Sequence, residues 1–193
     1  IVMTTTALCV SEEANVAAKH RFRAALLKAI AKNDREAFKA CVEQIGKNWG
    51  VCRNVETENK AGFGEDLWNN RAAILSGAYT GWENSPYSAY SYESKVCFLL
   101  NPLHYKLIYD SQTQTALNES VRSKWQERVE RYYRETLQFV PEDETDIDRI
   151  FREDYKLWAK DNEKLWLCGS NGRFQYKLGV TVETAQALSV SST

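Results

Sequence analysis

Apolar residues recur at helical spacing along most of this 193-residue chain, and this periodicity is the strongest constraint on its fold. The first stripe begins after Ser11, a residue type that often caps a helix, and continues to about Ala31. Later stripes predict five further helices, over residues 34–50, 66–78, 90–100 and 118–140 and from Thr145 onward to Leu165. A short helix is also expected directly after Asp110. We therefore predict an all-α protein.

The length suits one helical domain, residues 1–193, that can divide into two lobes. A polar segment at 51–65, punctuated by Gly62 and Gly64, predicts a loop or a subdomain boundary. A C-terminal tail over 170–193 follows the helices. Its residues 174–180 have partial β character, so we expect a short extension there.

Charge and cysteine content narrow the function classes. The 25 basic and 26 acidic residues give a formal net charge of −1, so any nucleic-acid surface must be a local basic face. No two of the five cysteines have C-x-x-C spacing, so we expect no zinc or iron–sulfur site, no metal and no cofactor. Scattered cysteines fit a reducing cytoplasmic compartment. No segment approaches the roughly 20 apolar residues that cross a bilayer, so we expect no membrane span.

One aspartate and one lysine suggest chemistry. Asp110 directly follows the apolar run Tyr105–Tyr109, where a charge is costly unless it is paired or used. Asp110 can stabilise a developing cation, or simply cap the next helix through the backbone of Gln112 or Thr113. Lys95, 15 residues upstream, can act as a nucleophile or phosphate contact, or lie on a solvated helix face.

Aromatic and basic residues supply further candidates. The turn-rich segment 79–92 carries Trp82, Tyr87, Tyr90 and Tyr92, which can stack an extruded base or form a hydrophobic latch between helices. Between about 122 and 134 the charges are dense. They form either a solvated helix face or a phosphate-contacting strip that includes Lys124, Arg128 and Arg131.

The run S-K-V-C-F-L-L-N-P-L-H-Y-K-L-I-Y-D-S, from Ser94 to Ser111, resembles the core of the helix-hairpin-helix DNA glycosylase superfamily in a divergent form. The resemblance covers about residues 86–118. It implies that Lys95 is the family lysine and Asp110 the catalytic aspartate. The glycine-rich hairpin that grips DNA backbone in the family has no counterpart just before Lys95, because Gly62-Phe63-Gly64 lies too far upstream.

The resemblance implies an enzyme that flips a modified or damaged base out of DNA and cleaves its N-glycosidic bond. Invading phage DNA with modified bases is one expected substrate, and phage defence one expected role. In this interpretation the base pocket is formed by Trp82, Tyr87, Tyr90 and Tyr92, and DNA is contacted by Ser94, Lys106, Lys124 and Arg128. We expect a cytoplasmic monomer whose partner is duplex DNA. The alternative is an inactive helical module that binds nucleic acid or protein.

Overall fold

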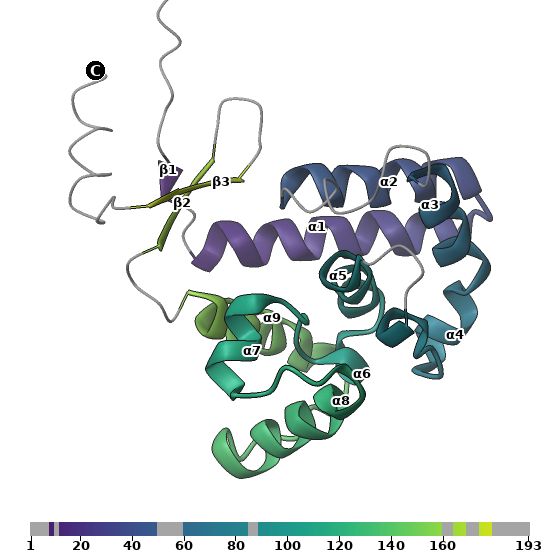
Figure 1. The fold of residues 1–193 in the computed structure, drawn as a ribbon. Coiled ribbons are helices and arrows are strands. Elements are labelled where there is room, and N and C mark those ends of the chain that lie inside the picture. The colour runs from purple at the N-terminus through teal and green to yellow at the C-terminus, as the bar shows by residue number, and fades with distance from the viewer. Residues whose placement is uncertain are drawn as a thin grey trace, which may run out of the picture.

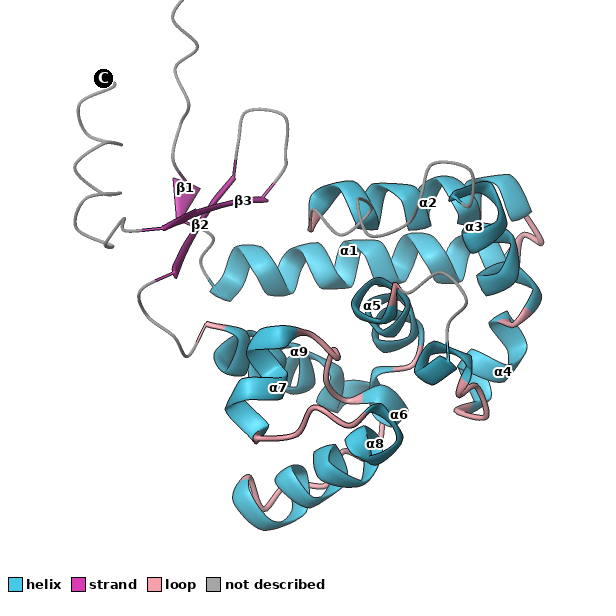
Figure 2. Ribbon diagram, viewed as in Figure 1, coloured by secondary structure: helices cyan, strands magenta, loops and turns pink. Residues whose placement is uncertain are grey.

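The computed structural model describes residues 8–9, 12–49, 60–84, 89–159, 164–168 and 174–178. Its body is all-α (Figures 1 and 2), as the periodicity predicts. The α-helices are α1 (Glu12–Ala31), α2 (Arg35–Asn48), α3 (Lys60–Asn69), α4 (Arg71–Ser76), α5 (Tyr90–Leu100), α6 (Pro102–Tyr105), α7 (Ser111–Leu117), α8 (Arg122–Arg131) and α9 (Ile147–Trp158). Short turns η3 (Gly81–Asn84), η4 (Tyr132–Thr136) and η5 (Glu144–Asp146) join them.

Helix α5 is the centre of the fold. Every side chain from Tyr92 to Leu100 is buried, because α1, α2, α4, α6 and η3 all pack around this helix. In Figure 1, α1–α4 lie on one side of α5 and α6–α9 on the other. Helix α9 joins the two groups, since it packs on α1 as well as on α6 and α7. Residues distant in sequence therefore meet beside the N-terminal half of α5.

A small antiparallel sheet accompanies the helices. Strand β2 (Lys164–Cys168) lies between β1 (Leu8–Cys9) and β3 (Phe174–Leu178), with Trp166 opposite Tyr176. Leu165 therefore belongs to a strand, and its predicted place on the inner side of the last helix is wrong. Helix α9 already ends at Trp158, with Ala159 as its C-cap.

Two other predicted boundaries are also wrong. The predicted helix 118–140 is interrupted, because Asn118 adopts a left-handed conformation that ends α7 and η4 is a π-turn followed by Gln138 at φ 48°. The predicted loop 51–65 overlaps α3, which begins at Lys60 and so includes both Gly62 and Gly64. Residues 50–59 lie outside the described part of the chain, as does the predicted cap Ser11.

Candidate functional site

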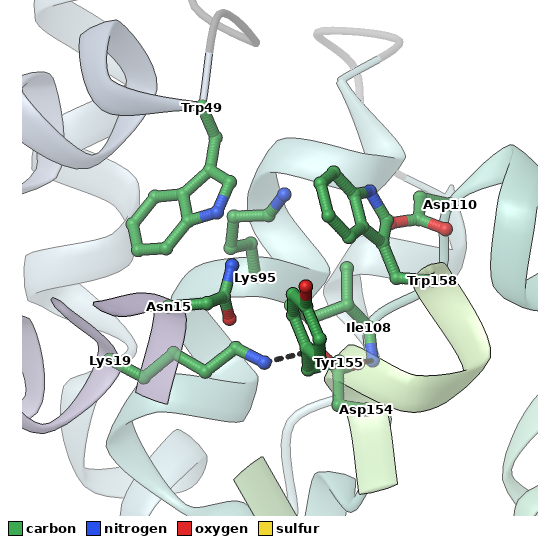
Figure 3. Close-up of a pocket in the computed structure, with 9 residues that line it drawn as sticks. All are labelled: Asn15, Lys19, Trp49, Lys95, Ile108, Asp110, Asp154, Tyr155 and Trp158. Carbon is green, nitrogen blue, oxygen red and sulfur yellow. Dashed lines mark hydrogen bonds and ion pairs between the residues drawn. The ribbon is translucent and has the colours of Figure 1, made fainter. Parts of the chain in front are cut away.

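A small pocket lies where α1, α5, α9 and the turn before α7 converge (Figure 3). Charged and aromatic side chains line it in nearly equal measure: Asn15, Lys19, Trp49, Lys95, Ile108, Asp110, Asp154, Tyr155 and Trp158. Its free volume is about 10 Å³, the room of a single water molecule. The structure thus brings Lys95 and Asp110, the two residues predicted to do chemistry, into one pocket.

Lys95 lies in the middle of α5 and is only 5% exposed, so it does not occupy a solvated helix face. In Figure 3 its amine points between the indoles of Trp49 and Trp158. The nitrogen lies 5.4 Å from the Trp49 ring centre. Within the described part of the chain, no hydrogen bond or ion pair of this nitrogen is found. Burial lowers the pKa of Lys95, against the opposing effect of the Asp110 carboxylate.

Asp110 begins α7 as its N-cap. Its Oδ1 accepts hydrogen bonds from the Thr113 backbone N–H at 2.9 Å and the Thr113 hydroxyl at 3.0 Å, which identifies Thr113 as the capped residue. The Asp110 N–H donates in return to Thr113 Oγ1, which completes a capping box. Burial raises the pKa of Asp110, while Lys95 and the Thr113 hydrogen bonds oppose the rise. Asp110 is therefore both a cap and a pocket residue.

A buried ion pair forms the floor of the pocket. Lys19 Nζ lies 2.7 Å from Asp154 Oδ2 and donates a second hydrogen bond to the Phe151 carbonyl at 3.0 Å. The other Asp154 oxygen accepts from the Ile108 N–H at 3.0 Å. Through Ile108, two residues before Asp110, the pair fixes the turn that presents the aspartate. Lys19 is 1% exposed and Asp154 2%.

Sequence reasoning missed this pair, although a signal for it exists. Lys19 follows Val16 and precedes Phe22 on the buried stripe of α1, and Asp154 lies between Phe151 and Leu157 on that of α9. A charged residue at a stripe position predicts a buried charge that needs a partner. The partner of each charge depends on how α1 and α9 pack together, because Lys19 and Asp154 are 135 residues apart in the sequence.

The pocket therefore holds two lysines and two aspartates in balanced charge. The Asp110 and Asp154 carboxylates favour the protonated form of Lys95, whereas Lys19 disfavours it. Chemically, this arrangement offers an amine whose lowered pKa makes it a better nucleophile, beside a carboxyl group whose raised pKa suits proton exchange. Among the described residues, no group of three or more His, Cys, Asp or Glu side chains can hold a metal ion.

The aromatic walls are Trp49, at the end of α2, and Tyr155 and Trp158, on α9. The predicted wall from segment 79–92 is elsewhere. Trp82 is buried against Tyr109, with ring centres 5.4 Å apart. None of the described predicted wall residues lines the pocket: Trp82, Tyr90 and Tyr92. These residues therefore fit the second interpretation of segment 79–92, a hydrophobic latch between helices.

The two other described wall residues, Tyr90 and Tyr92, have identifiable roles in packing. Tyr92 packs on Phe63 and its hydroxyl donates to the Val42 carbonyl at 2.5 Å. Tyr90 is half-buried beneath the Arg122 guanidinium, 3.7 Å from the ring centre. Tyr87 lies outside the described residues.

The predicted DNA contacts are mostly internal. The hydroxyl of Ser94 accepts a hydrogen bond from the Tyr109 N–H at 3.1 Å. Lys106 is 6% exposed and paired with Glu130, and Arg128 donates to the Leu117 carbonyl at 2.9 Å. Of the four, Lys124 alone is exposed. Contact between DNA and any of these residues stays a prediction.

Comparison with known proteins gives no relative from which to transfer a function. No family model, no curated protein and no solved structure matches this chain. No helix of the described residues is long and apolar enough to cross a membrane.

Proposed function

We propose that this protein is a DNA N-glycosylase that removes a modified or damaged base, including modified bases of invading phage DNA. The observation that carries the proposal is the meeting of Lys95 and Asp110 in one aromatic-walled pocket, although they belong to different elements. Lys95 is only 5% exposed, and burial lowers its pKa and raises the pKa of Asp110; paired shifts of this kind are typical of functional sites.

The groups in the pocket suit cleavage of the bond between the sugar C1′ and the base nitrogen. As that bond breaks, its electron pair leaves with the base, and positive charge develops on the sugar. The Asp110 carboxylate would stabilise this charge. The Lys95 amine, in its neutral form, would donate its lone pair to C1′ and pass a proton to the departing base or to Asp110. Alternatively, Asp110 would orient a water for the same attack.

A base cannot enter a space of about 10 Å³, so binding requires the aromatic walls to move apart. Trp158 is partly exposed at the end of α9, and Trp49 lies at the end of α2. An extruded base would then stack between these indoles, in place of its neighbours in the duplex. We expect base release to require both indoles.

The test is release of bases from oligonucleotides that carry a panel of modified pyrimidines and purines. Asp110→Asn keeps the cap, since asparagine caps helices as well as aspartate, but removes the charge; we expect base release to fall by about 10²-fold or more. Lys95→Gln should abolish any adduct that borohydride traps between protein and DNA. The matched control is Asp143→Asn, which makes the same change at an exposed helix cap outside the pocket.

One observation favours a second candidate, an inactive binding module. The four buried charges balance and nearly fill the pocket, as a purely structural cluster would. If the wild-type protein releases no base from any substrate, and Asp110→Asn alters only the free energy of unfolding, the glycosylase proposal is rejected and the module is favoured.

A further inference from the structure

Among the described residues that line the pocket, Asn15 is the one with an amide side chain. It extends from the first turn of α1 and is 4% exposed. Its Oδ1 is buried and has no hydrogen-bond partner among the described residues. Buried side-chain oxygens are nearly always paired, and leaving one unpaired is destabilising. Pairing of this oxygen therefore falls to a molecule that enters the pocket.

The oxygen of Asn15, and not its nitrogen, is the buried atom that lacks a partner among the described residues. Figure 3 shows the amide between Trp49 and Lys19, with its nitrogen on the Lys95 side and its oxygen on the Lys19 side. The Lys19 ammonium is already bonded to Asp154 and to the Phe151 carbonyl. A ligand that pairs with Oδ1 must therefore bring a hydrogen-bond donor.

We infer that Asn15 selects bases that carry an exocyclic amino group, by accepting a hydrogen bond from it. The inference rests on the proposed function, because it takes the ligand of the pocket to be an extruded base. An amino group gives Oδ1 the donor that it lacks. A carbonyl at the same position would place two acceptors face to face and leave both unpaired, which a buried site rejects strongly.

The test measures binding and needs no catalysis. Two oligonucleotides differ only in the target nucleotide, 2′-fluoro-deoxycytidine or 2′-fluoro-deoxyuridine, whose fluorine blocks cleavage. Each target lies opposite an abasic spacer, so that neither base is paired and extrusion costs the same. We expect the wild-type protein to bind the amino-bearing oligonucleotide about tenfold more tightly, and Asn15→Leu to bind both equally.

Asn48→Leu is the matched control. It makes the same substitution at an amide on α2 whose buried Nδ2 is also unpartnered but does not line the pocket, and the preference should persist. Equal binding of the two oligonucleotides by the wild-type protein overturns the inference, whether or not base is released from cleavable DNA. A preference that survives in Asn15→Leu overturns it too. A preference lost in that variant, without base release by the wild type, supports Asn15 as the selector while it rejects the glycosylase.

Discussion

Removing one charge of the Lys19–Asp154 pair should destabilise the protein far more than removing both. Asp154→Asn keeps the shape of the side chain and an oxygen for the Ile108 N–H, but leaves the Lys19 ammonium buried without a counter-charge. At 1% exposure water cannot replace the lost carboxylate. We expect a loss of about 3–5 kcal/mol, a large part of the stability of a domain of this size. Lys19→Met should cost about as much, because it strands the Asp154 carboxylate.

The double variant Lys19→Met/Asp154→Asn contains no stranded charge. Its loss should be smaller than either single loss, since apolar and neutral groups of similar volume replace buried pairs at little cost. The assay is urea unfolding followed by tryptophan fluorescence. With a slope of about 2 kcal/mol per molar urea, a 4 kcal/mol loss moves the midpoint by about 2 M.

The matched control is the exposed pair Arg131–Glu127, whose side chains are 49% and 74% exposed. Arg131→Met should cost only about 0.3–0.5 kcal/mol, and less at high salt. The reasoning is refuted if the single losses at Lys19 and Asp154 stay below about 1 kcal/mol, or if they simply add in the double variant.

Three further substitutions and one control substitution test single features of the structure. Burial lowers the pKa of Lys95 in the folded protein below its ordinary value of 10.5. At a pH between the folded and the unfolded pKa, the unfolded chain holds more protons than the folded protein, so the free energy of unfolding rises with pH. Lys95→Met should remove this rise, which is measured as the urea midpoint at a series of pH values. Thr113→Val should cost about 1–2 kcal/mol and raise the pKa of Asp110 further, as NMR titration of the carboxyl would show. Gly77→Ala should lower the thermal midpoint by a cost of about 1–2 kcal/mol, because φ is 77° and the new Cβ would meet a histidine ring at 2.7 Å. Gly64→Ala, inside a helix and near only a flexible lysine chain, should be neutral or stabilising.

The sequence predicts the helices well where an apolar stripe is long. Helix α1 ends at Ala31, as its stripe predicts, and α5 spans the predicted residues 90–100. Local signals fail where packing overrides them. Gly62 and Gly64 read as a loop, yet both lie within α3, where Gly64 packs closely on Lys39.

The residues of the candidate site also fall into two groups: those that the sequence indicates, and those whose place depends on tertiary packing. Lys95 and Asp110 stand out because they flank one apolar run, so the chain itself indicates that they lie close. Asn15 and Asp154 do not, because their place depends on how α1 and α9 meet. The aromatic wall was expected from the nearest aromatic cluster in sequence, around Trp82, but that residue packs into the core.

The double role of Asp110 has a consequence for the evolution of this protein. A residue that starts α7 and also lines the pocket cannot change freely, because alanine there would remove the cap and cost about 1 kcal/mol. Asparagine and serine preserve the cap and discard the charge. If Asp110 has the proposed catalytic role, descendants that lose the activity and keep the fold are expected to carry asparagine or serine at position 110, so this position would show whether a lineage still uses its pocket.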